Sequence, residues 1–277
     1  MTKKQLIMDH ALELFAKNGI KSTSIQQITD SCGMSKGAFY LSFTSKGELV
    51  ISLIDRFMIQ YISDVDYLVN NVGKEQLLSE FLTYTFTYFL EHNNFAKVFL
   101  KEQSHQVNEE LILKVKGYDR KFNESLYVLV NKLYENKQTN EKHELVYVIK
   151  ALIEMYRMFS FHSENKLDLA LFVQSLIDKI QVIAQYGTIS FVTEDLFIQL
   201  NADIGSIDVD TLSDLIDKAM EEVEDNIVIE SLQLLKEHLT GESMSLAIVQ
   251  GLLHNIQSHL ACKEVSYYYR KYLNGLF

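Results

Sequence analysis

The 277-residue chain contains no proline and no tryptophan, and it has only 11 glycines and two cysteines. At an average usage of about 5%, a chain of this length would hold roughly 14 prolines, so their absence favours long, uninterrupted helices. The composition therefore predicts an all-α protein.

Cys32 and Cys262 are far apart in the sequence and are expected to be packed thiols rather than a disulfide, with redox sensing by Cys32 as the alternative.

Long apolar runs are absent as well. Nowhere do 18 apolar residues follow one another without a charge, and no apolar run follows the lysines at the N-terminus. The sequence thus predicts no membrane span and no cleaved signal, and we expect a cytoplasmic protein. The eight histidines lack metal-site spacing, and there is no glycine-rich phosphate loop or nucleophile elbow. We expect no metal, no other cofactor and no enzymatic activity.

The net charge of -11 is distributed unevenly. Residues 1–60 carry a net charge of +2, residues 61–194 carry -4, and residues 195–277 carry -9. Only the first segment can approach phosphates without strong repulsion. If the chain binds nucleic acid, it should do so with this segment, and binding should weaken steeply with salt.

Residues 24–46 carry the signals of two short helices joined by a tight turn. Ser24 and Gln27 have the spacing of a capping box, and Gly33 can end the first helix in the left-handed conformation. Ser35 then offers an N-cap for the second helix. Together these features predict a helix-turn-helix, which is a DNA-binding motif.

The second of these helices has two distinct faces. Phe39 and Phe43, with Ala38, are its expected packing residues, which leaves Lys36, Gly37 and Tyr40 on a shared outward face. Further capping boxes are predicted at Thr2 with Gln5 and at Ser45 with Glu48. The N-terminal unit is therefore expected to be three helices that precede a long fourth.

This pattern resembles the N-terminal signature of the TetR family of transcriptional regulators over about residues 3–50. The agreeing positions are Ile7, Ala11, Leu14, Phe15, Gly19, Thr23, Ser24, Ile28, Cys32, Gly33, Met34, Ser35, Lys36, Gly37, Tyr40, Phe43, Ser45 and Lys46. The resemblance implies an all-helical homodimer that binds a palindromic operator in double-stranded DNA. It further implies that the DNA is released when a small molecule enters a helical C-terminal domain. The leading hypothesis is therefore a repressor, and the aromatic residues of the middle of the chain suggest a hydrophobic effector.

Matched residue by residue, the family's DNA contacts fall on Ser24, Ser35, Lys36, Gly37, Tyr40 and Lys46. The chain departs from the family at Leu41 and Ser42, where many members have an aromatic residue and a histidine, and at Gly47, where they have an acidic residue. The first departure removes polar contacts, so the operator sequence cannot be transferred from a relative.

The chain divides into a predicted helix-turn-helix DNA-binding domain (1–48), a helical ligand-binding and dimerisation domain (49–190) and an acidic helical C-terminal extension (191–277). Between residue 45 and residue 186, apolar periodicity predicts helices at 45–69, 74–90, 95–103, 108–134, 143–162 and 167–186. In the extension it predicts helices at 194–200, 210–224, 226–239, 243–262 and 264–273.

The helices at 143–162 and 167–186 correspond to the pair that forms a four-helix bundle with its twin in the family. The residues predicted to lie in this dimer interface are Ile149, Ile153, Tyr156, Phe172, Leu176 and Ile180. A purely intramolecular core is the alternative for them. A two-fold dimer would place its two recognition helices, the second helices of the helix-turn-helix motifs, in major grooves about 34 Å apart or a multiple of that distance.

The middle of the chain is unusually aromatic and is the predicted effector site. The candidate effector-binding residues are Phe81, Tyr84, Tyr88, Phe99, Tyr118 and Phe122, with polar contacts from Glu102, Gln103, His105 or Arg157. The same aromatic residues could instead fill the core. The alternative function is a DNA-bound interaction protein that has no small-molecule effector and acts through a protein partner of the C-terminal extension. The acidic run at 217–225 could contact a basic partner or could simply be a solvated helix face.

Overall fold

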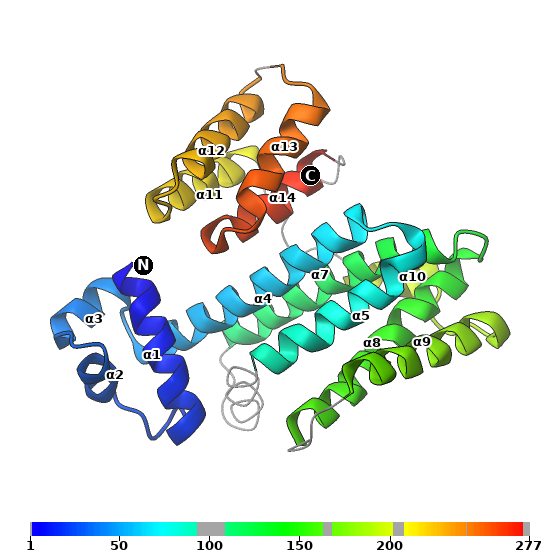
Figure 1. Ribbon diagram of the computed structural model, residues 1–277, viewed down its shortest axis with the longest axis horizontal. Helices are drawn as coiled ribbons and strands as arrows, with labels where there is room; N and C mark the ends of the chain where they lie inside the picture. Colours follow the sequence, from blue (N-terminus) through cyan, green and yellow to red (C-terminus); the bar gives the residue numbers. More distant parts are fainter. Residues whose placement is uncertain (1, 93–108, 163–167, 202–207, 242, 274–277) are drawn as a thin grey trace.

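The computed structural model describes residues 2–92, 109–162, 168–201, 208–241 and 243–273 (Figure 1). Within these ranges the chain is helical and has no strand, as the sequence predicts. The predicted helix at 95–103 lies outside the described residues, as do Phe99, Glu102, Gln103 and His105. No described helix is long and apolar enough to span a bilayer.

The N-terminal head consists of α1 (Lys3–Asn18), α2 (Ile25–Ser31) and α3 (Lys36–Ser42). The predicted capping boxes of α1 and α2 are confirmed, because Thr2 and Ser24 each exchange hydrogen bonds with the glutamine three residues later. Gly19 and Gly33 follow α1 and α2 with φ of 85° and 65°, a conformation that favours glycine. Local sequence signals thus account for both ends of α1 and α2, and the predicted N-cap Ser35 accounts for the start of α3.

Helix α4 (Lys46–Asn71) connects the head to the rest of the molecule. Its N-cap differs in one detail from the predicted capping box. Ser45 Oγ accepts a bond from the Glu48 amide, but the Glu48 carboxylate accepts from the amide and hydroxyl of Thr44, both at 2.6 Å, instead of the Ser45 amide. These bonds also lower the pKa of Glu48.

The body surrounds α4 with α5 (Lys74–Glu91), α7 (Glu109–Leu133), α8 (Thr139–His162) and α9 (Leu169–Tyr186). Helix α8 begins four residues before its predicted start at residue 143. The Gln138 amide donates to the Glu141 carboxylate, and this bond caps the helix within the segment expected to connect it to the preceding helix. One continuous apolar cluster runs from the head through α4 to α9. The head is therefore packed onto the body rather than tethered to it.

The predicted extension contains two parts. Helix α10 (Glu194–Asn201) packs on α7 and α8 of the body. The C-terminal module that follows comprises α11 (Val209–Glu222), α12 (Asn226–Leu239), α13 (Leu246–Gln257), the 3-10 turn η1 (Leu260–Cys262) and α14 (Lys263–Leu273), around an apolar core of its own. The predicted helix at 243–262 is therefore split. Figure 1 shows this module on the side of α4 opposite to α8 and α9.

Candidate nucleic-acid interface

The turn between α2 and α3 is held by backbone geometry and one long-range contact. Gly33 adopts φ of 65°, and the Met34 amide donates to the Thr29 carbonyl at 2.9 Å. The Cys32 thiol donates to the Leu6 carbonyl on α1. Burial raises the pKa of the Cys32 thiol.

Two aromatic side chains orient α3 on the head. Phe39 and Phe43 are 0% and 1% exposed, and their rings lie 5.8 Å apart in the apolar cluster that also includes Ile7 and Phe15. Because the inward face of α3 is fixed by these rings, the opposite face is held in a defined orientation toward solvent. This confirms the predicted division of α3 into a packing face and an outward face.

The outward face carries the three predicted residues together. Lys36, Gly37 and Tyr40 are all exposed, and the Tyr40 ring contacts the Phe39 ring edge to face with centroids 5.4 Å apart. A Cβ placed on Gly37 would meet only Ser35 Oγ, at an ordinary contact distance of 3.6 Å. Packing within the described residues therefore does not require glycine at this position.

Leu41 also lies on this surface and is 91% exposed. The sequence pattern predicts only the loss of a polar contact at this position. An exposed apolar side chain on a recognition helix can contact the methyl group of thymine in the major groove. The sequence signal for this exposure is that Leu41 does not share the spacing of the packing residues of α3, Phe39 and Phe43.

The two serines act first as helix caps. Ser24 Oγ accepts from the Gln27 amide at 3.2 Å, and Ser35 Oγ accepts from the Ala38 amide at 3.2 Å. Both residues are exposed and lie at the N-termini of α2 and α3. Ser35 directly precedes Lys36 and so borders the outward face of α3.

Lys46 has a role inside the chain that its position in the motif does not reveal. Its ammonium donates to the carbonyls of Ile20 and Thr23, at 2.8 and 2.9 Å. These carbonyls belong to the connection between α1 and α2, so Lys46 ties this connection to the start of α4. Only one of its three N–H donors remains for a phosphate.

Four of the six residues predicted for the dimer interface are buried within the single chain. Ile149, Ile153, Leu176 and Ile180 are at most 3% exposed within the single chain. Phe172 contacts the rings of Phe86 and Tyr156, so it also packs inside the protomer. Ile149, Ile153, Leu176 and Ile180 thus belong to the intramolecular core that was the alternative, because α8 packs mainly on α7 and α9 mainly on α5. Tyr156 and Phe172 are half-buried, and their place in a dimer interface stays a prediction.

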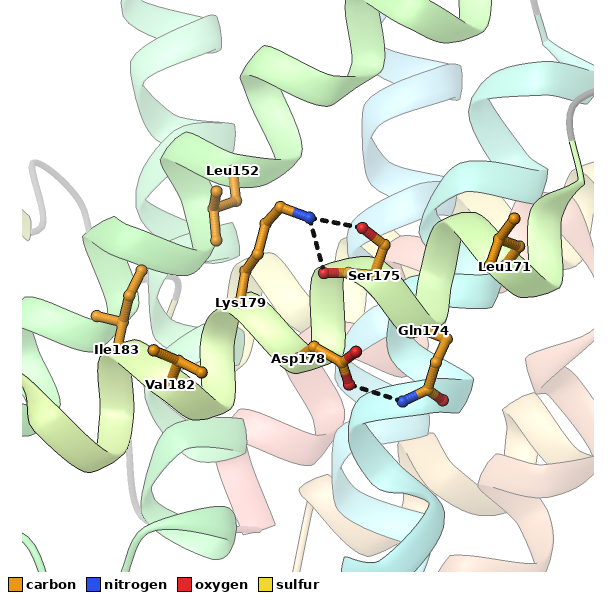
Figure 2. A pocket seen from close by; sticks show the side chains of 8 residues that line it. All are labelled: Leu152, Leu171, Gln174, Ser175, Asp178, Lys179, Val182 and Ile183. Atoms are coloured by element: carbon orange, nitrogen blue, oxygen red, sulfur yellow. Dashed lines mark hydrogen bonds between the residues drawn. The ribbon is translucent and has the colours of Figure 1, made fainter.

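The outward side of the same helices carries a different apolar set. The exposed members are Met155, Leu171, Val182, Ile183 and Tyr186. Three of them, Leu171, Val182 and Ile183, line an open groove of about 470 Å³ together with Leu152 and polar residues of α9. Figure 2 shows that Lys179 and Asp178 in this groove bond to side chains of α9 itself, Lys179 to Ser175 and Asp178 to Gln174. The surface between them is mainly apolar.

The described aromatic residues of the predicted effector site are tightly packed. Tyr61 of α4 contacts the rings of Tyr84, Tyr88 and Phe122 at centroid distances of 5.3 to 6.2 Å, and Phe81 stacks on Phe122. Their hydroxyls are satisfied within the chain: Tyr84 donates to Asp64, Tyr88 to the Phe57 carbonyl and Tyr118 to Asp55. In the described residues this set fills space, and its effector role stays a prediction.

Arg157 is the described polar candidate beside this cluster. Its guanidinium lies 5.4 Å from the centre of the Phe89 ring, and its buried Nε has no hydrogen-bond partner among the described residues. It is thus a cation at the edge of an aromatic cluster. In the same described ranges, no three His, Cys, Asp or Glu side chains are grouped so that they could hold a metal ion.

Comparisons with known proteins agree with this geometry. A sequence model of the family described as "Bacterial regulatory proteins, tetR family" matches residues 7–53. Two proteins of Bacillus subtilis (strain 168), the uncharacterized HTH-type transcriptional regulators YuxN and YerO, are 26% and 27% identical to the chain. Each match covers 92% of this chain and about nine tenths of the relative (91% and 89%).

Solved structures match a shorter part. A transcriptional regulator (TerR/AcrR family) from Aquifex aeolicus VF5 is 22% identical with a TM-score of 0.51, and the match covers 66% of this chain and 99% of that one. The TetR family transcriptional regulator PfmR from Thermus thermophilus is 19% identical with a TM-score of 0.53, over 63% of this chain and 96% of its own. About a third of this chain thus has no counterpart in these two structures, whereas both Bacillus proteins match over nearly its full length.

Proposed function

Because the chain belongs to the TetR family of bacterial transcriptional regulators, we propose that it is a cytoplasmic, homodimeric repressor. It binds a palindromic operator with the outward face of α3, and a small hydrophobic molecule releases it. The observation that supports this proposal is that Lys36, Gly37 and Tyr40 are exposed together on one face of α3. The opposite face of the helix is fixed by the buried rings of Phe39 and Phe43. The three exposed residues lie in the segment of the chain that has a positive net charge.

Each residue of the interface has a distinct role in this proposal. Lys36 and Tyr40 contact phosphates, and Gly37 lets the backbone approach the DNA closely. Ser24 and Ser35 contact the DNA backbone at the edges of the face, and the remaining donor of Lys46 contacts a further phosphate. Leu41 contacts a thymine methyl group and contributes to base preference.

Two protomers associate through the outward faces of α8 and α9. The exposed apolar set of Met155, Leu171, Val182, Ile183 and Tyr186 supports this arrangement, because a contiguous apolar surface is costly to leave in water. The face lies on the side of the molecule away from the C-terminal module (Figure 1), so the module does not obstruct it.

The effector is proposed to enter the aromatic cluster between α4, α5 and α7. Packing of the described rings means that binding has to move at least one of them, and an effector shifts the equilibrium only by its difference in affinity between the two states. Arg157 supplies one cation beside the cluster. A screen for the effector should therefore include both neutral and acidic hydrophobic compounds.

The experiment that tests the proposal is selection of DNA by the full-length protein from a random double-stranded library. The expected result is a palindrome whose half-sites are one or more helical turns apart, occupied by one dimer. Selection of a single unrepeated half-site would contradict the dimeric mode, and no enrichment at all would contradict sequence-specific DNA binding.

A second function is favoured by the charge of the extension. Four of the five basic residues in 195–277 are held in ion pairs: Lys236, Lys263, Arg270 and Lys271. The acidic side chains of this part that remain exposed include Asp210, Asp214, Glu221, Glu230 and Glu237. This surface suits a basic protein partner. Thermal stabilisation by hydrophobic compounds would favour the effector mechanism, whereas a partner that depends on the extension, with no compound altering DNA affinity, would favour this one.

A further inference from the structure

The contact between the C-terminal module and the body is mainly polar. The module and the body have separate apolar clusters, and among the described buried side chains of the module only Tyr267 belongs to the cluster of the body. Helix α14 packs along α4, the helix that carries the head. Polar interfaces between units depend on direction and distance more than apolar ones, because each hydrogen bond and ion pair has a preferred geometry.

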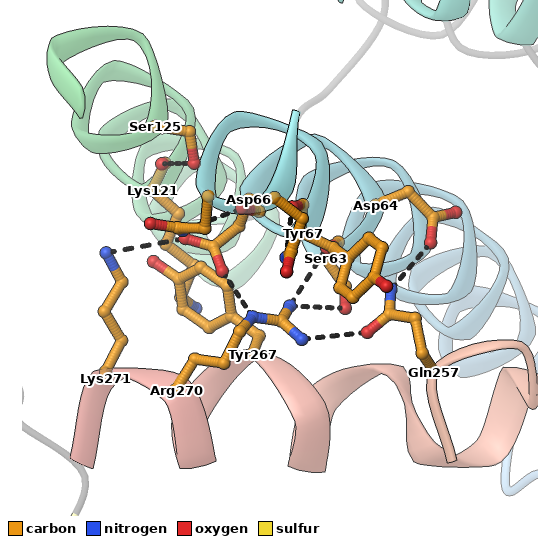
Figure 3. Close-up of polar contacts among 12 residues, drawn as sticks. Ser63, Asp64, Asp66, Tyr67, Lys121, Ser125, Gln257, Tyr267, Arg270 and Lys271 are labelled. Atoms are coloured by element: carbon orange, nitrogen blue, oxygen red, sulfur yellow. Dashed lines mark hydrogen bonds and ion pairs between the residues drawn. The ribbon is translucent and has the colours of Figure 1, made fainter. Parts of the chain in front are cut away.

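Arg270 is the centre of this contact, as Figure 3 shows. Its Nε donates to Asp66 at 2.6 Å, one terminal nitrogen donates to the Ser63 carbonyl at 3.0 Å, and the other donates to Gln257 at 2.8 Å. The side chains of Arg270 and Asp66 are only 11% and 3% exposed. One guanidinium thus binds both the backbone and a buried carboxylate of α4.

Asp64 forms a second attachment point on the same helix. It accepts hydrogen bonds from Tyr84 of α5 at 2.8 Å and from Gln257 of α13 at 3.1 Å, and it is paired with Lys263 of α14. A single carboxylate on α4 therefore joins the aromatic cluster of the body to the C-terminal module.

Helix α7 adds a third attachment. The Lys121 ammonium lies 5.3, 5.9 and 5.0 Å from the ring centres of Tyr118, Tyr267 and Tyr268, and Lys271 pairs with Glu124 at 3.0 Å. Two of these rings belong to α14. The module is consequently fastened to α4 and α7 together, which fixes its orientation on the body.

The other end of α4 is fastened to the head. Arg56 pairs with Asp9 of α1 at 2.8 Å, and Lys46 binds the connection between α1 and α2. The attachment at Ser63 lies 17 residues along α4 from Lys46, which is roughly 25 Å at 1.5 Å per residue. Over that length a tilt of α4 by about 5° moves the head by about 2 Å. When α4 tilts in both protomers of a dimer, the separation between the two heads changes by about one base-pair step of 3.4 Å.

We propose that Arg270 and Lys263 are positioning residues for operator binding. By holding α4 at Ser63, Asp64 and Asp66, they fix the orientation of the head and hence the half-site spacing that the dimer accepts. This inference rests on the proposed function, because spacing is defined only for a dimer on a palindrome. It gives the C-terminal module a role in DNA recognition without any contact to DNA.

The test compares full-length wild-type protein with the variants Arg270→Gln and Lys263→Gln. The matched control is Lys236→Gln, which breaks the Lys236–Asp217 pair inside the module and leaves the contact with α4 intact. The probes are the palindrome selected with the wild-type protein and two derivatives whose spacing is one base pair longer or shorter. Affinity is measured by fluorescence anisotropy, folding by circular dichroism, and hydrogen exchange is followed in residues 60–71.

Wild type and Lys236→Gln should prefer the selected spacing by about tenfold, the order of a typical coupling between sites. In Arg270→Gln and Lys263→Gln this preference should largely disappear, while exchange in residues 60–71 becomes faster and the helical content is retained. If Arg270→Gln does not fold, the spacing preference of Lys263→Gln alone tests the positioning role.

An unchanged spacing preference in a folded variant would overturn the positioning role and leave DNA binding untouched. Selection of no DNA sequence by the wild-type protein would contradict the proposed function itself, so the two failures are distinguishable.

Discussion

Lys36 and Lys46 are ten residues apart in the same motif, yet the fold gives them different environments. Lys36 is exposed at the first position of α3, whereas the ammonium of Lys46 is bonded to two backbone carbonyls of the head. The resemblance to the family assigned DNA contact to both residues. The structure adds an internal structural role for Lys46 alone.

Replacing Lys36 by alanine is expected to weaken operator binding by about tenfold and to make the slope of log K against log salt shallower by about 0.9, the loss of one phosphate contact. Titrations at several salt concentrations measure both quantities. Lys116→Ala removes the same charge from an exposed site on α7 and should leave both unchanged. An unaltered slope in Lys36→Ala would remove this residue from the interface.

Replacing Lys46 by methionine should lower the free energy of unfolding by about 2 kcal/mol, because hydrogen bonds to charged groups are worth more than neutral ones and two carbonyls lose their donor. Chemical denaturation followed by circular dichroism gives this value. Lys36→Met, at an exposed position, is the control and should have little effect. Equal stability of the two variants would show that the bonds of Lys46 contribute nothing to folding.

Among the helices, α10 is attached to the body through a titratable group. His143 of α8 is 3% exposed and stacks on Phe197 of α10 with ring centroids 4.2 Å apart. Its Nδ1 has no hydrogen-bond partner among the described residues. Burial lowers the pKa of His143 below its ordinary value of 6.5, and the charge of Glu194 acts in the opposite direction.

Because the folded chain binds this proton less readily than the unfolded chain, unfolding takes up a proton below about pH 6.5, and stability falls there until the folded-state pKa is passed. His143→Phe keeps the stacking and removes the titration. Thermal unfolding at about pH 8 and about pH 5.5 should therefore show a smaller loss of stability for the variant than for the wild type. A loss of the same size in both proteins would contradict this role of His143.

At the scale of the whole molecule, two surfaces on opposite sides of α4 have different chemistry. The outward side of α8 and α9 is apolar, whereas the C-terminal module turns most of its basic residues inward and exposes acidic ones. The first surface suits a second copy of the chain. The second surface repels phosphates, so the head remains the favourable contact for DNA.

Substitution of Val182 by aspartate should dissociate the proposed homodimer, because it places a charge in the proposed apolar interface, where the carboxylate loses its hydration. Sedimentation equilibrium measures the mass, and circular dichroism should show unchanged helicity. Val182 is 56% exposed in the protomer; Ile227, at 64% on the C-terminal module, provides the matched control Ile227→Asp. A dimer that tolerates Val182→Asp would place the interface elsewhere.

The local structure of this protein could be predicted from its sequence alone. Caps at Thr2, Ser24 and Ser35 and glycines at 19 and 33 set the helices of the head, because these signals act through hydrogen bonds and backbone angles only a few residues apart. Apolar periodicity likewise located most helices of the body and the extension. The outward face of α3 followed from the same local pattern.

The inward rows of α8 and α9, in contrast, became known only from the packing of the folded chain, since periodicity shows a face and not its partner. The same holds for the bonds of Lys46 and for the attachment of Arg270 and Lys263 to α4. These contacts join residues from 23 to 207 positions apart, and no local rule predicts which carbonyl or carboxylate the folded chain brings within reach of a distant cation.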